Sequence, residues 1–193
     1  MKQAIIIATH NKFKPWLLNF IKTYDSHYDL LFTYNTDVNN ICDVKALITG
    51  IESDYDEFLV FHDTIEIKDN KIFDIIFEQY KGRSVYLRKL SCMFLAKYTK
   101  TDLAEMPSEN MQALYKVTNK KEGVNQEDTF NNMYKNVSNP IYLFDDFKDN
   151  PVRENKFGRN NMIIENEYLK KYKGSWNMDC VLKSYFYVPT MED

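Results

Sequence analysis

The chain has 193 residues, of which 44% are hydrophobic and 27% are charged, and its net charge is −3. This length suits one domain with a sizeable core, and five glycines and five prolines are too few for a typical disordered chain. The net charge gives no electrostatic reason to expect nucleic acid as a partner. The apolar opening at residues 4–8 is too short for a signal peptide or a membrane span, so we expect a cytoplasmic protein with no integral membrane segment.

The first half of the chain alternates apolar runs with amphipathic segments. Residues 2–9 and 28–34 are rich in apolar and β-branched side chains, which predicts two strands. The segment 13–24 between them carries apolar residues at helical spacing after Pro15, which suits the first turn of a helix. Strand, helix and strand at this spacing predict a βαβ unit with parallel strands and a right-handed crossover. A second amphipathic helix is predicted at residues 43–53.

The most apolar strand is predicted at residues 58–61, where apolar residues stand in a row between polar neighbours. Such a run indicates a strand buried on both faces, as in a parallel sheet covered by helices. The run stops abruptly on His62 and Asp63. Ligands of these sheets bind beyond the carboxyl ends of the strands, where a carboxylate can bind a hard divalent cation and, through it, a phosphorylated ligand. The same residues also fit an ordinary strand end followed by a turn, with His62 as a hydrogen-bonded structural histidine.

Polar residues follow each of the three predicted strands. Thr9, His10 and Asn11 end the first strand, Asp37 follows the second, and Asp63 follows the third. Because the strands are expected to be parallel, these residues are predicted to line one edge of the sheet. Asp37 also fits a turn that only terminates its strand.

The second half of the chain has less regular patterns. Helices are predicted at 70–80, 101–105 and about 165–173, and strands at 84–88, 140–144 and 181–188. The polar segment 118–126 contains Gly123 and is predicted to be a mobile loop that closes over a bound ligand. The next residues, Glu127 and Asp128, are predicted to lie at a helix start, where they could simply complement the positive end of the helix.

The order of these features resembles that of GT-A-type glycosyltransferases, the nucleotide-diphospho-sugar transferases. The resemblance rests on the opening βαβ half, the acidic strand end at residues 62–64 and the later acidic pair at 127–128, and it extends from residue 3 to about residue 176. It implies a single GT-A-like domain over residues 1–193, an α/β fold with a mostly parallel, mixed sheet flanked by helices. The strand end reads His-Asp-Thr instead of Asp-X-Asp, so the second acid of the metal motif is missing unless Glu66 or another residue replaces it.

The resemblance also implies a role for each polar residue. The residues that it places at the nucleotide or its diphosphate are Thr9, His10, Asn11, Asp37 and Arg159, with lysines 170, 171 and 173 as further candidates. Asp63 would bind a divalent cation, Mn²⁺ or Mg²⁺. Glu127 and Asp128 resemble the Glu-Asp pair of inverting members, in which one carboxylate is the general base toward the acceptor hydroxyl. We choose Asp128, because Glu127 shares the helix face that carries Phe130 and Tyr134. The lysines also fit a solvated helix face.

These residue types suit the chemistry of sugar transfer. A sugar leaves a nucleoside diphosphate when the developing negative charge is stabilised and a base removes a proton from the attacking hydroxyl. We therefore expect a glycosyltransferase that takes a sugar from a nucleotide-sugar donor to an unknown acceptor. The alternative is a catalytically inactive GT-A-like protein that binds a nucleotide or a partner.

Overall fold

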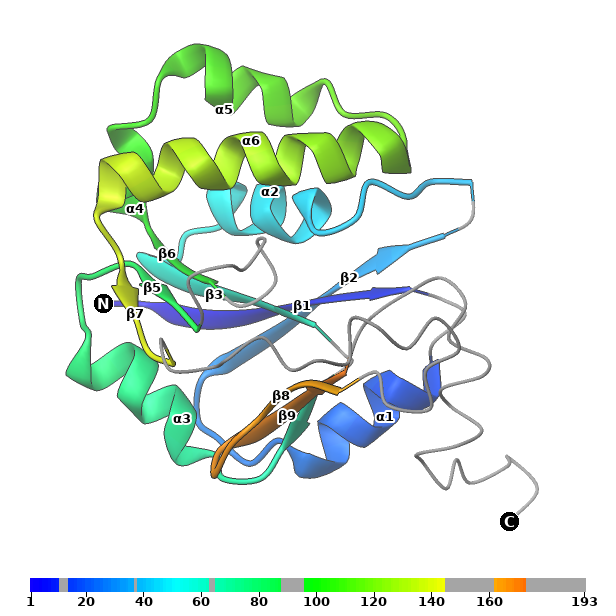
Figure 1. Cartoon of the computed structure of the whole chain (residues 1–193), viewed down its shortest axis with the longest axis vertical. Coiled ribbons are helices and arrows are strands. Elements are labelled where there is room, and N and C mark those ends of the chain that lie inside the picture. The colour runs from blue at the N-terminus through cyan, green and yellow to red at the C-terminus, as the bar shows by residue number, and fades with distance from the viewer. Residues whose placement is uncertain (11–13, 37, 63–64, 88–95, 145–161, 173–193) are drawn as a thin grey trace.

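The structure is a computed structural model that describes residues 1–10, 14–36, 38–62, 65–87, 96–144 and 162–172. These residues form a six-stranded mixed sheet flanked by helices, with a three-stranded sheet beside it (Figure 1). The chain is therefore of the α/β class, as predicted.

The first half of the chain forms consecutive βαβ units around a central strand. The elements are β1 (Gln3–His10), α1 (Lys14–Thr23), β2 (Asp29–Asn35), α2 (Val44–Glu52) and β3 (Glu57–His62). β1 pairs in parallel with β2 on one side and with β3 on the other. All of these strands and helices were predicted from the sequence, and each observed boundary differs from the predicted one by a single residue.

The second half of the chain completes the six-stranded sheet. β5 (Val85–Tyr86), β6 (Ala96–Thr99) and β7 (Ile141–Tyr142) extend it in the order β2-β1-β3-β6-β5-β7. β6 is antiparallel to both β3 and β5, whereas β5 and β7 are parallel, so the sheet is mixed. The remaining helical elements are α3 (Lys71–Asp74), the π-helical segment η2 (Ile75–Gln79), α4 (Lys100–Ala104), α5 (Ser108–Tyr115) and α6 (Lys120–Ser138).

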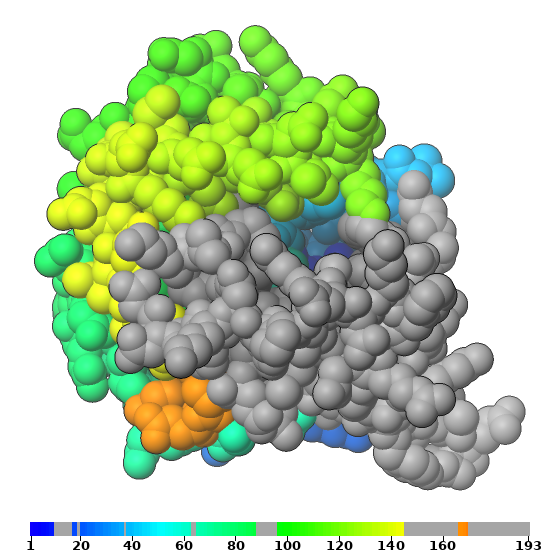
Figure 2. Space-filling view, in the orientation of Figure 1, coloured from blue at the N-terminus to red at the C-terminus, as the bar shows by residue number. Residues whose placement is uncertain are grey.

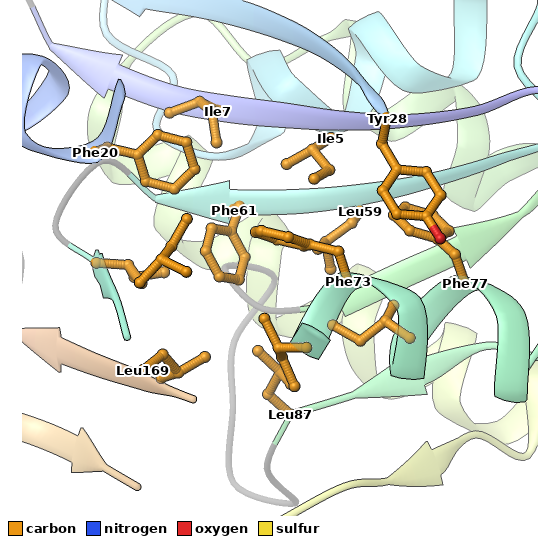
Figure 3. Close-up of a cluster of buried hydrophobic side chains, with 14 of the residues drawn as sticks. Ile5, Ile7, Phe20, Tyr28, Leu59, Phe61, Phe73, Phe77, Leu87 and Leu169 are labelled. Carbon is orange, nitrogen blue, oxygen red and sulfur yellow. The ribbon is translucent and has the colours of Figure 1, made fainter. Parts of the chain in front are cut away.

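Helices cover both faces of the main sheet. α1 and α3 lie on one face, while α2, α5 and α6 lie on the other (Figure 1). β1 and β3 contribute Ile5, Ile7, Leu59 and Phe61 to the first core (Figure 3), and Ile6, Ala8, Phe58 and Val60 to the second. Alternate residues of a strand point to opposite faces, so both strands are buried on two sides, as the unbroken apolar run in β3 predicts. In the space-filling view, α5 and α6 form the upper part of the molecular surface (Figure 2).

The three-stranded sheet overturns the helix predicted at about 165–173. Its strands are β4 (Ile65–Ile67), β9 (Leu169–Tyr172) and β8 (Met162–Glu165), in that order, and both pairings are antiparallel. Leu and Lys favour a helix locally, but the fully buried Leu169 belongs to the first core and its strand pairs with β4. Tertiary pairing therefore outweighs the local helix propensity.

The start of α6 overturns the mobile loop predicted at 118–126. Asn119 is the N-cap, and its Oδ1 accepts a hydrogen bond from Glu122 N over 3.1 Å. Glu122 Oε2 in turn accepts one from Thr118 N over 2.8 Å. This reciprocal arrangement is a variant of the capping box. Residues 120–126 are helical, so the predicted closing loop is wrong, and the acidic pair at 127–128 lies inside the helix and not at its start.

A buried ion pair supports the amino end of β3. Lys97 Nζ lies 3.3 Å from Glu57 Oε1, and the two side chains are 0% and 1% exposed. Glu57 also accepts hydrogen bonds from Gly82 N and Gln3 Nε2, and Lys97 donates to Tyr80 O. Burial lowers the pKa of Lys97, against the raising effect of the Glu57 charge. These contacts lie at the end of β3 opposite to the predicted site.

Candidate functional site

The carboxyl ends of β1, β2 and β3 meet at one edge of the main sheet. Across the sheet, Ala8 stands opposite His62, and His10 stands opposite Asn35. α1 packs in the core on one face and α2 in the core on the other, so the connections leave β1 and β2 toward opposite faces. Such a reversal is the topological switch point of an open α/β sheet, where ligands bind.

Asp43 and His62 meet at this edge. Asp43 occupies the N-cap position of α2, and the beginning of α2 lies at the carboxyl edge because this helix follows the parallel strand β2. The Nε2 atom of His62, the last residue of β3, lies 2.5 Å from Asp43 Oδ1. An ionised carboxylate only accepts hydrogen bonds, so toward such a group Nε2 is the donor. The contact orients the His62 ring against Asp43.

Glu127 reaches the same place from α6. Its Oε1 accepts a hydrogen bond from the Asp43 backbone N–H over 2.8 Å, and the residue is 7% exposed. Burial raises the pKa of Glu127 well above its ordinary value, and the nearby charge of Asp43 raises it further. The hydrogen bond from Asp43 acts in the opposite direction. A carboxyl group with a raised pKa is suited to proton transfer closer to neutral pH than an ordinary glutamate.

The beginning of α6 packs closely on the residues that precede α2. A Cβ atom at Gly123 would lie 2.7 Å from Ile41 O, so the close approach of the two backbones requires glycine. Cys42 Sγ lies 4.0 Å from Lys120 O. Burial, followed by the charges of Glu127 and Asp43, raises the pKa of Cys42 to about 12. The thiol therefore stays protonated near neutral pH and is a poor nucleophile.

The predicted site residues differ in where they lie, and some of them fall outside the described part of the chain. Thr9 is buried near the end of β1, and Glu127 lies beside Asp43. Asp128 is exposed on α6, and His10 is the last residue of β1. The predicted residues that lie outside the described part of the chain are Asn11, Asp37, Asp63 and Arg159, together with Lys173. The roles assigned to all of these residues stay predictions.

Sequence reasoning missed Asp43 as a site residue. It precedes an amphipathic run, so its pattern indicates only the start of a helix. A signal was nevertheless present in the predicted topology. A helix that follows a parallel strand begins at the carboxyl edge of the sheet, and this places Asp43 on the same edge as His62.

The donor atoms at this edge suit a cation without forming a metal centre on their own. Asp43 and Glu127 offer carboxylate oxygens and His62 offers an imidazole nitrogen, donor types that bind divalent metals. Asp43 Oδ1 and Glu127 Oε1 are already engaged in the hydrogen bonds given above. Within the ranges that the structure describes, no three His, Cys, Asp or Glu side chains are grouped so that they could hold a metal ion. The predicted ligand Asp63 lies outside those ranges.

Comparison with protein-family models, with curated proteins and with solved structures finds no match to this chain. The resemblance to GT-A-type glycosyltransferases therefore stays a prediction from the sequence. Among the helices of the described residues, none combines the length and the apolar character needed to cross a membrane.

Proposed function

We propose that the protein is a glycosyltransferase that moves a sugar from a nucleoside-diphosphate donor to an acceptor hydroxyl. The observation that carries the proposal is the meeting of Asp43, His62 and Glu127 at the switch point of the α/β sheet. Ligands of open α/β sheets bind at this position. Sugar transfer also needs a base for the acceptor hydroxyl and a means of stabilising the leaving diphosphate.

The nucleotide is proposed to lie along the carboxyl ends of β1, β2 and β3. The residues assigned to it by the resemblance are Thr9, His10, Asn11 and Asp37, with Arg159 at the diphosphate. Of these, Thr9 and His10 end β1, which pairs with both β2 and β3. This central position in the parallel half of the sheet supports their assignment.

The general base is proposed to come from the pair Glu127 and Asp128. Glu127 has a raised pKa and lies beside Asp43, but it is almost completely buried. Asp128 is exposed and is therefore accessible to an acceptor. The two side chains leave α6 about 100° apart, so a substrate at one of them does not contact the other in the same way. Glu127 offers the raised pKa, and Asp128 offers the exposure that contact with an acceptor needs.

Asp63 is proposed to bind a divalent cation. When bound, such a cation would neutralise negative charge on the leaving diphosphate. The edge already carries the carboxylate of Asp43, and its negative charge would repel a diphosphate that bound directly. A cation between the protein and the diphosphate removes this repulsion.

A second candidate is a GT-A-like protein that binds a nucleotide or a partner without catalysis. One observation favours it: Asp43 is hydrogen-bonded to His62 through its side chain and to Glu127 through its backbone N–H. A polar network of this kind also serves to fix a fold. The two candidates differ in whether bound donor is cleaved.

The deciding experiment measures nucleoside-diphosphate release from a panel of sugar nucleotides, with and without Mn²⁺, beside equilibrium binding of UDP. A transferase should release the diphosphate, and Asp63→Ala should abolish the metal-dependent part. Asp54→Ala, which changes an exposed carboxylate beyond the opposite edge of the sheet, should behave like the wild-type protein. Binding without release would favour the non-catalytic candidate. If no nucleotide binds, the transferase and the nucleotide-binding form of the second candidate are both wrong.

A further inference from the structure

Asn35 and Glu127 bind opposite sides of a single peptide group. The Nδ2 atom of Asn35, at the end of β2, donates to Cys42 O over 3.2 Å. The N–H of Asp43 donates to Glu127 Oε1 over 2.8 Å. This carbonyl and this N–H belong to one peptide unit, which is planar. The end of β2 and the helix α6 therefore fix together the orientation of the peptide that leads into Asp43.

Asn35 also binds the backbone of Ile41, the residue before Cys42 in the same loop. Its Oδ1 accepts a hydrogen bond from Ile41 N over 3.1 Å, and the residue is 4% exposed. Asn40 Oδ1 accepts one from Cys42 N over 3.1 Å. The consecutive backbone N–H groups of residues 41, 42 and 43 are thus each bound by a side-chain oxygen. Such bonds define the path of a loop that lacks the repeating hydrogen bonds of helices and strands.

The backbone of Cys42 needs this support. Its φ of 56° lies in the left-handed region. This conformation is unfavourable for a residue with a Cβ atom, and it persists where the surrounding structure enforces it. Asn35 binds the carbonyl of Cys42, and Asn40 binds its N–H. The turn at Cys42 directs the next residue, Asp43, toward both His62 and Glu127.

The two bonds to the peptide group reinforce each other. A hydrogen bond to a carbonyl oxygen polarises the peptide and makes its N–H a better donor. The bond from Asn35 to Cys42 O therefore strengthens the bond from Asp43 N to Glu127. Asn35 thus influences Glu127 through the peptide that both residues bind.

We propose that Asn35 is a positioning residue, which sets Asp43 against His62 and Glu127 by holding the peptide group between residues 42 and 43. The proposal rests on the proposed function only in treating this edge as the ligand-binding site. The hydrogen bonds that it invokes belong to the protein alone. The effect of Asn35 on the position of Asp43 is therefore tested without a ligand.

The test uses Asn35→Asp, in which the side chain keeps its size and its acceptor for Ile41 N–H but loses the donor to Cys42 O. Hydrogen exchange of the Asp43 amide, followed by NMR, should accelerate roughly five- to tenfold, because the bond to Glu127 weakens. Exchange of the Ile6 amide in β1 should not change. The affinity for UDP with Mn²⁺ should fall in the same variant. Asn39→Asp, the same chemical change at an exposed position of this loop, should leave all of these measurements unaltered.

Unchanged exchange at Asp43 in Asn35→Asp would overturn the proposal. Equal acceleration throughout β1 and β3 would also overturn it, since that result reports general destabilisation. Asn35→Ala, which removes both side-chain bonds, serves as a second variant if Asn35→Asp does not fold. The double variant Asn35→Ala, Glu127→Gln should accelerate exchange of the Asp43 amide by less than the product of the two single accelerations. An acceleration equal to that product would contradict coupling through one peptide. If wild-type protein does not bind UDP, the proposed function fails while the exchange data still decide the role of Asn35.

Discussion

Glu127 Oε1 accepts a hydrogen bond from the backbone N–H of Asp43 over 2.8 Å, although the two residues are 84 positions apart in the sequence. The bond joins the interior of α6 to the beginning of α2 at the carboxyl edge of the sheet. Burial and the charge of Asp43 both raise the pKa of Glu127. The folded protein therefore holds this proton more tightly than the unfolded chain does.

This pKa shift predicts a pH-dependent stability. A group whose folded pKa is raised contributes stability that is fully present below its unfolded pKa and is lost as pH rises through the folded value. The free energy of unfolding should therefore decline as pH rises from the ordinary pKa of glutamate, about 4.3, to the raised pKa of Glu127. In Glu127→Gln this decline should be absent, because glutamine does not ionise. Urea unfolding at a series of pH values measures the effect.

Glu122→Gln provides the matched control on the same helix. Hydrogen bonds from Thr118 lower the pKa of Glu122, so its contribution is present above the unfolded pKa and is lost as pH falls. This variant should change only the acid side of the stability curve. If the curves of Glu127→Gln and the wild-type protein stay parallel across the whole range, the raised pKa of Glu127 is wrong.

Gly123→Ala should destabilise the protein even though alanine is the better helix former by about 1 kcal/mol. The added Cβ would lie 2.7 Å from Ile41 O, a backbone atom that cannot move without shifting the loop before α2. We expect a net loss of roughly 1–3 kcal/mol, measured by urea unfolding. Asn125→Ala, at an exposed position of the same helix, should be neutral or slightly stabilising. Equal stability of the two variants would mean that α6 does not pack closely on this loop.

Lys97→Met should cost about 3–5 kcal/mol, because it leaves the buried Glu57 carboxylate without its positive partner. The double variant Lys97→Met, Glu57→Gln should lose less than this, since no unpaired charge remains. Thermal and urea unfolding of both proteins give the comparison. Lys2→Ala removes the exposed partner of Asp54 and should barely change stability. A double variant that is less stable than Lys97→Met would show that the unpaired charge of Glu57 is not the main cause of the stability lost in Lys97→Met.

The two candidate bases are separated by isosteric changes. Asp128→Asn and Glu127→Gln are each assayed for sugar transfer and, separately, for donor binding. Loss of the base should reduce turnover about a hundredfold or more while binding is retained. The variant that shows this pattern identifies the base. Full activity in both variants would remove the pair from the mechanism and favour the non-catalytic candidate.

The parallel half of the fold could be predicted because its local patterns and its tertiary packing agree. In β1 and β3, unbroken apolar runs match burial against two cores, and the amphipathic helices between the strands each cover one face. The shared edge of Thr9, Asn35 and His62 follows from parallel pairing alone. The placement of Asp43 was within reach by the same reasoning.

The remaining errors arise where distant contacts decide the structure. Gly123 suggests a loop, yet it is needed for the approach of α6 to Ile41, a contact that sequence spacing does not reveal. Capping residues carried a usable signal: Asn119 precedes Glu122 by three positions, and Thr99 accepts a hydrogen bond from Asp102 N at the start of α4. The strand β9 pairs with β4 from about a hundred residues away, so its helix-favouring composition misleads.

The central position of β1 has a consequence for synthesis on the ribosome. β1 is made before its neighbours in the sheet, β2 and β3, which are completed only when residues 35 and 62 have been made. Its run Ala4, Ile5, Ile6, Ile7 and Ala8 therefore remains without strand partners for a few seconds at translation rates of about 5–20 residues per second. An apolar, β-branched strand in this state is the kind of segment that molecular chaperones bind during translation. The nascent chain thus exposes an aggregation-prone strand until its two parallel neighbours have been made.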